Sequence, residues 1–109
     1  MLTDTHCHLD DEKFFDDLDD VFARAVDAGI GKFVIPGAGT KDLPRAIEIC
    51  EKYEYVYFAV GVHPYHASEF DKGIFSLLSH PKCVAVGECG LDYYRLPEGE
   101  DEKKAEKEL

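Results

Sequence analysis

The chain has 109 residues, of which 45% are hydrophobic, and a formal net charge of −11. A chain of this length forms one domain or part of one, with a core of moderate size. The acidic balance argues against a nonspecific nucleic-acid-binding surface, which needs a basic patch, but not against an enzyme that holds phosphates through bound cations. No apolar run approaches the roughly 18 residues that a membrane-spanning helix needs, so we expect no membrane partner.

The cysteines indicate a reducing environment. Cys7, Cys50, Cys83 and Cys89 show no C-x-x-C spacing. The N-terminus has Asp4 before any Lys or Arg and lacks a signal-peptide pattern. We therefore expect mostly buried, reduced thiols in a cytoplasmic protein. Because no base can be identified beside Cys89, a buried thiol is favoured there over a nucleophile.

The first apolar segment, residues 3–7, predicts a short buried strand that carries an H-x-H pair. Alternate side chains of a strand share a face, so Asp4, His6 and His8 should point the same way. The two histidine Cα atoms would lie roughly 6.6 Å apart, which lets both rings reach one metal ion. Asp4 would orient a histidine by accepting its free ring N–H. Two surface histidines in a loop remain the alternative, because H-x-H also occurs by chance.

Strands and helices then alternate along the chain. Apolar residues recur at helical spacing between Leu18 and Val26, and Gly29 ends that helix. Thr40 is expected to cap the second helix, with Pro44 in its first turn. The expected strands are residues 3–7, 32–35, 56–60 and 83–86, and the expected helices are residues 17–28, 41–53 and 71–78, followed by a charged, helix-prone segment from residue 98.

The apolar strands lack clear alternation, which is typical of a parallel α/β sheet covered by helices. The unusual residues of the chain follow directly after its strands. In barrels and in open doubly wound sheets, chemistry collects at the carboxyl ends of the strands. No G-x-G-x-x-G or phosphate-loop motif follows the first strand, which disfavours a nucleotide-binding open sheet.

Glu88 lies between two glycines just after the fourth strand, whose inward face would include Val84 and Val86. A carboxylate at this position, beside His6 and His8, could bridge two ions about 3.5–4 Å apart. A glutamate that caps the next helix or faces water is the alternative. The H-x-H pair expected at the same end of the sheet favours the metal ligand.

Further polar residues follow the third and fourth strands. His63 precedes Pro64 and could contact a substrate phosphate, act as a general acid or fill the barrel mouth. A substrate role is favoured over a ligand role. Asp92 and Arg95 could position substrate or form a structural pair, and the two possibilities stay open. His66 and His80 are interpreted as helix caps or exposed residues.

Four motifs together resemble the TatD family of metal-dependent hydrolases. They are the stretch from Asp4 to Asp10, the Pro36-Gly37 pair, Gly61-Val62-His63-Pro64 and the stretch from Gly87 to Arg95. The last is the most specific, whereas H-x-H alone is shared with wider amidohydrolase and PHP-type phosphoesterase groups. The resemblance implies a TIM-type (β/α)₈ barrel, of which residues 1–109 form roughly the first half. It also implies deoxyribonuclease activity with two divalent metal ions, Mg²⁺, Mn²⁺ or Zn²⁺.

Carried over by position, the resemblance implies that His6 and His8 ligate one ion and that Glu88 bridges both. It places His63 on the side of the DNA substrate. The family also uses two histidines and an aspartate from later strands, and a barrel of this kind has about 250 residues. We therefore expect this chain alone to be nearly inactive.

Three other expectations concern function and association. The first and fourth strands would be open edges through which the chain could self-associate. An amidohydrolase-type enzyme acting on small amides or esters could use the same ligands. A noncatalytic half-barrel that binds metal or a partner chain is the remaining alternative.

Overall fold

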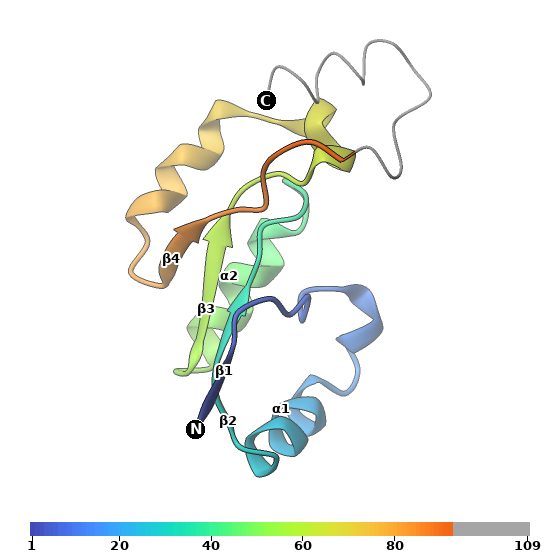
Figure 1. Cartoon of the computed structure of the whole chain (residues 1–109), viewed down its shortest axis with the longest axis vertical. Coiled ribbons are helices and arrows are strands. Elements are labelled where there is room, and N and C mark those ends of the chain that lie inside the picture. Colours follow the sequence, from blue (N-terminus) through green and yellow to red (C-terminus); the bar gives the residue numbers. More distant parts are fainter. Residues whose placement is uncertain (93–109) are drawn as a thin grey trace.

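Four parallel strands in chain order form the centre of the structure, a computed structural model that describes residues 1–92 (Figure 1). Each strand pairs in parallel with the next, so every connection moves the chain one strand along the sheet. The predicted α/β architecture, part of a barrel built from successive strand–helix units, is confirmed. The strands are β1 (Leu2–Asp4), β2 (Ile30–Ile35), β3 (Val56–Val60) and β4 (Cys83–Val86).

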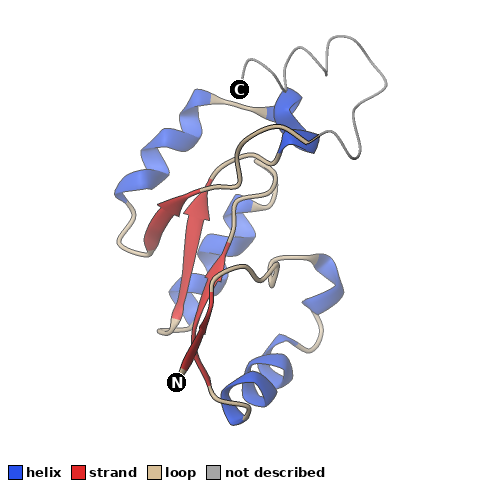
Figure 2. Ribbon diagram, viewed as in Figure 1, coloured by secondary structure: helices blue, strands red, loops and turns tan. Residues whose placement is uncertain are grey.

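Helical segments connect the strands, and Figure 2 shows α2 lying along one face of the sheet. All strand arrows point to the same end of the molecule, where the loops that follow the strands gather. Within residues 1–92, no helix has the length and apolar character needed to cross a bilayer. The helical segments are η1 (Glu12–Phe14), α1 (Leu18–Asp27), α2 (Leu43–Lys52), η2 (Pro64–Glu69) and η3 (Lys72–Ser79).

The core lies between the sheet and its helices. Phe22 of α1 is 1% exposed and meets Phe33 of β2 edge to face, with ring centroids 5.0 Å apart. Ile49 and Cys50 of α2 pack with Phe58 of β3 in the same buried cluster. Fully burying one such apolar side chain contributes about 1.5–3 kcal/mol, so this layer fixes the strands and the loops that follow them.

The two outer strands are exposed in the described part of the chain. β1 and β4 each pair with one strand, in agreement with the expected open edges. Val84 and Val86, expected to face inward, are 54% and 70% exposed because no described element covers them. Leu2 is 67% exposed, so the prediction of a buried first strand was wrong.

Several boundaries differ from the sequence-based expectation. β1 ends at Asp4, so His6 and His8 lie in the loop after the strand. Thr40 does not cap α2. Its hydroxyl donates to the backbone carbonyl of Glu69 at 3.0 Å, and Asp42 occupies the N-cap position. This contact spans 29 residues of sequence, which local capping rules do not anticipate.

The third connection also differs from the prediction. The helix expected over residues 71–78 is the 3₁₀ helix η3, and a second 3₁₀ helix, η2, precedes it. Pro64 at the first position of η2 favours this start, because its missing N–H would be unpaired there in any case. The helix-prone segment from residue 98 and Arg95 lie outside the described residues.

A lysine ties the starts of β3 and β4 together. The ammonium group of Lys82 donates to the carbonyls of Tyr53, Glu54 and Val56 at 3.3, 2.5 and 3.0 Å. Lys82→Met should therefore lower the free energy of unfolding by about 1.5–3 kcal/mol, since the charged hydrogen bonds are lost. Urea denaturation measures the change. Lys41→Met is the control, because the Lys41 side chain is 87% exposed, and equal effects of the two changes would contradict this role.

Candidate metal centre

Three glycine-containing loops meet at the carboxyl end of the sheet. The N–H of Gly37, after β2, donates to the carbonyl of Gly87, after β4, at 2.9 Å. The N–H of Glu88 donates back to the carbonyl of Gly37 at 2.7 Å. Gly61, after β3, lies between them, and a Cβ atom there would sit 2.4 Å from the carbonyl oxygen of Glu88. Only residues without side chains permit this approach, which holds Glu88 over the strand ends.

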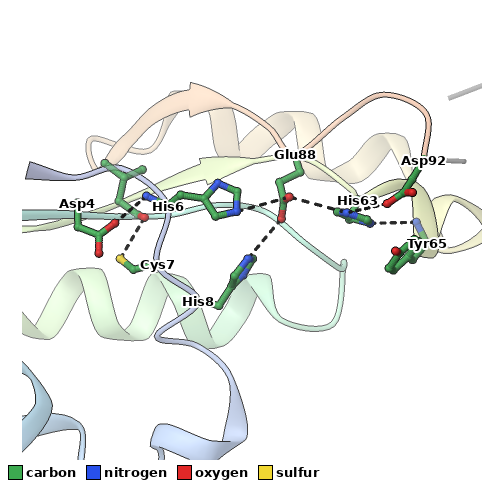
Figure 3. Close-up of polar contacts among 9 residues, drawn as sticks. Asp4, His6, Cys7, His8, His63, Tyr65, Glu88 and Asp92 are labelled. Atoms are coloured by element: carbon green, nitrogen blue, oxygen red, sulfur yellow. Dashed lines mark hydrogen bonds and ion pairs between the residues drawn. The ribbon is translucent and has the colours of Figure 1, made fainter. Parts of the chain in front are cut away.

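Two histidines approach Glu88 from the loop after β1 (Figure 3). Nε2 of His6 lies 3.7 Å from Oε1 of Glu88, and Nε2 of His8 lies 3.7 Å from Oε2. One ligand atom from each of the three residues lies within 4.8 Å of the others. Donors that each sit about 2.1 Å from one ion are at most about 4.2 Å apart, so these side chains fit a divalent ion with small adjustments.

The backbone between the histidines is anchored to β2. The N–H and the thiol of Cys7 both donate to the carbonyl of Val34, at 3.2 and 3.3 Å. Burial raises the pKa of the Cys7 thiol to about 12, so it stays neutral and acts as a hydrogen-bond donor. Asp4 accepts the backbone N–H of His6 at 3.0 Å. Asp4 thus contacts the backbone of His6, and its expected contact with a histidine ring stays a prediction.

His63 and Asp92 lie beside this group. Nδ1 of His63 accepts the backbone N–H of Tyr65 at 3.1 Å. In the neutral ring the proton then sits on Nε2, which lies 3.9 Å from Oε1 of Glu88 and 4.0 Å from Oδ2 of Asp92. The structure thus brings together five of the six residues singled out at the strand ends, and the sixth, Arg95, lies outside the described residues.

Two residues of this region were missed or underrated. Asp10 is 6% exposed, and burial raises its pKa to about 6. Its position two residues after His8 was the only sequence signal for it. His66, interpreted as a cap or exposed residue, has Nδ1 2.9 Å from a carboxylate oxygen of Glu69 and lines a cavity together with His8.

The thiols are only partly as expected. All four cysteines are free, and Cys50 is fully buried. Burial raises the pKa of Cys50 to about 12. Cys89 is exposed, which corrects the expected buried thiol, because the loop that carries Glu88 turns it outward beside an uncovered strand.

Comparison with known proteins agrees with this geometry. The family described as TatD related DNase matches residues 3–109. The chain belongs to the TatD family. It is 39% identical to an uncharacterized metal-dependent hydrolase, YabD of Bacillus subtilis, and 34% identical to the 3'-5' ssDNA/RNA exonuclease TatD of Escherichia coli K12. Each match covers 86% of this chain and 38% of the relative, so the chain spans well under half of the length of these TatD relatives.

Solved structures of TatD proteins share the fold. A crystal structure of YJJV, a TatD homolog from Escherichia coli K12, matches with a TM-score of 0.81 and 31% identity. A TatD family hydrolase from Entamoeba histolytica matches with a TM-score of 0.84 and 27% identity. The matches cover 99% and 98% of this chain but 43% and 44% of those chains. The described strands and helices therefore form part of a TatD-type barrel.

Gly61→Ala tests the loop contact that positions Glu88. The new methyl group would overlap the carbonyl of Glu88, so we expect a loss of about 1–3 kcal/mol in stability and altered NMR shifts for the rings of His6 and His8. Gly73→Ala is the matched control, because its nearest atom is a side-chain oxygen at 3.3 Å that can move. Unchanged stability and ring shifts in Gly61→Ala would contradict the described contact.

Proposed function

We propose that His6, His8 and Glu88 hold divalent metal and that the protein hydrolyses phosphodiester bonds of single-stranded DNA. The observation that carries this proposal is the convergence of two imidazoles and one carboxylate within 4.8 Å at the carboxyl end of the sheet. The family match, described as TatD related DNase, supports the reaction class. Because the chain spans 38% of its relatives, the activity is proposed for a protein that carries the complete barrel.

The donor set suits a pair of ions. Oε1 of Glu88 lies 3.7 Å from His6 and Oε2 lies 3.7 Å from His8, so one oxygen can join both histidines on one ion while the other serves a neighbouring ion. When bound, divalent ions would polarise the phosphoryl oxygens and provide an activated water. Imidazole ligands suit Zn²⁺, whereas phosphoryl chemistry suits Mg²⁺ or Mn²⁺.

His63 is proposed to bind the substrate beside these ligands. Its Nδ1 is occupied by the backbone N–H of Tyr65, which leaves Nε2–H as the ring donor that faces the site. A phosphate oxygen close to Glu88 would come within reach of that donor. Asp92, 4.0 Å from the same nitrogen, would orient the ring. A role for Arg95 in holding the substrate stays a prediction from the sequence.

Metal binding can be tested on this chain directly. His6→Ala and His8→Ala should each weaken the binding of Zn²⁺ or Mn²⁺, measured by calorimetry at neutral pH. Loss of a residue that only supports a ligand costs roughly 10–100-fold in metal affinity, and loss of a ligand should cost at least as much. His80→Asn is the control, because His80 lies away from the site, beside Glu51 of α2, and asparagine keeps an acceptor for the backbone N–H of Lys82 that Nδ1 of His80 accepts at 3.0 Å. Equal metal affinity in the unchanged chain and its three variants would remove the basis of the proposal.

The reaction is tested in a protein with the complete barrel. Glu88→Gln should lower the rate of cleavage of a labelled single-stranded DNA by about 100-fold, since the bridging charge is lost. Glu51→Gln makes the same change on an exposed face of α2 and should leave the rate unchanged. Faster hydrolysis of small esters than of DNA would favour the amidohydrolase alternative. We expect these 109 residues alone to cleave no faster than their own Glu88→Gln variant.

A further inference from the structure

A cavity of about 400 Å³ lies beside the candidate metal centre, and His8 lines both. We propose that this cavity binds an unpaired nucleobase with an amino group, from the nucleotide whose phosphate lies at the metal centre. This inference rests on the proposed function, since it assumes a nucleic-acid substrate. The residues that line the cavity and carry the argument are His8, Asp10, Phe15, Asp42 and His66.

Asp10 is a largely buried acidic residue that lines the cavity. Its side chain lines the cavity although the residue is only 6% exposed. Its own backbone N–H lies beside its carboxylate. A carboxylate removed from water is costly unless donors replace the lost hydration. An occupant that donates N–H groups would supply them.

The negative charge of the residues that line the cavity favours the base of a nucleotide over its phosphate. Asp10 and Asp42 line the cavity together with the acidic residues Asp11 and Glu12. These carboxylates would repel phosphate oxygens, whereas they match the exocyclic amino groups of bases, as when Asp or Glu accepts from cytosine N4. Of the described residues, only His6, His8 and Glu88 form a three-ligand group suited to an ion, so a second cation site in this cavity lacks geometric support.

Phe15 offers a surface on which a base can stack. Its side chain is 51% exposed and lines this cavity as well as a neighbouring one of about 290 Å³. Arg45 also lines the second cavity, and its guanidinium carbon lies over the Phe15 ring at 4.8 Å from the centroid. The ring is therefore supported by a cation from the second cavity. Bases stack on such exposed rings regardless of sequence.

The opposite wall is held in place by an ion-pair chain. Nδ1 of His66 lies 2.9 Å from Glu69, and Lys41 lies 3.6 Å from the same carboxylate. A Cβ atom on Gly39 would come within 3.2 Å of Asp42 and 3.7 Å of His66, so these residues pack around the loop after β2. His66 is thus held in the cavity lining by its pairing with Glu69.

The test uses NMR titrations of this chain with two nucleotides, dCMP and dUMP, whose bases differ at ring positions 3 and 4. We expect dCMP to bind about 10-fold more tightly, the discrimination typical of one good base contact. Asp10→Asn should remove most of this preference, and Phe15→Ala should weaken both nucleotides. Asp27→Asn and Phe75→Ala are the matched controls, since Asp27 ends α1 outside the cavity lining and Phe75, 54% exposed, belongs to η3.

Deoxyribose 5-phosphate carries the sugar and phosphate of a nucleotide but no base, so its binding tests the proposed metal site separately from the base site. If its binding needs Zn²⁺ and is lost in His6→Ala, the metal proposal stands whatever the base does. Equal affinity for dCMP and dUMP, unchanged in Asp10→Asn and Phe15→Ala proteins whose amide spectra show the native fold, would overturn the base site. A chain with both His6→Ala and His8→Ala lacks the two histidines of the metal centre. If adding Asp10→Asn to that chain lowers its Zn²⁺ affinity further, the base site is overturned as well, because the cavity would then be a cation site.

Discussion

The contact between the glycine loops after β2, β3 and β4 is the constraint on which the site depends. Glu88 is 80 residues from His8 in sequence, and it reaches the histidines because its backbone N–H bonds to Gly37 across the end of β3. A Cβ atom on Gly61 would lie 2.4 Å from the carbonyl oxygen of Glu88 and 2.6 Å from that of Gly87, so a side chain there would displace this loop. The positions of these glycines are therefore part of the site, although they contribute no ligand atom.

The histidines depend on a different kind of support. Cys7, between them, is fixed to Val34 by two hydrogen bonds, so the side chains on either side of it are directed to Glu88. The buried layer between the sheet and its helices fixes β2, the strand of Val34, and β2 in turn fixes the loop that carries the histidines. Packing at the centre of the sheet thus determines geometry at its end, which explains why exposed side chains (that of His6 is 57% exposed) can still converge.

Much of this arrangement was predictable because it is local. The apolar runs that predicted strands at residues 56–60 and 83–86 match β3 and β4, and residues that follow parallel strands meet at one edge. The hydrogen bond of Thr40 to Glu69, the burial of Asp10 and the exposure of Val86 were not predictable. Each depends on which distant segment packs against the residue, and no local pattern carries that information.

The negative charge of the chain explains why the proposed site would need metal ions. A chain with net charge −11 cannot attract a nucleic acid by its overall field, so the proposed substrate would have to be held where cations neutralise local carboxylates. Glu88 can have that neutralisation from metal held with His6 and His8, whereas Asp10, which is buried, does not belong to that group. Carboxylates would thus have opposite effects on phosphate at these two neighbouring sites. They would recruit ions, and through them phosphate, at Glu88, and they would exclude phosphate and accept base N–H groups at Asp10.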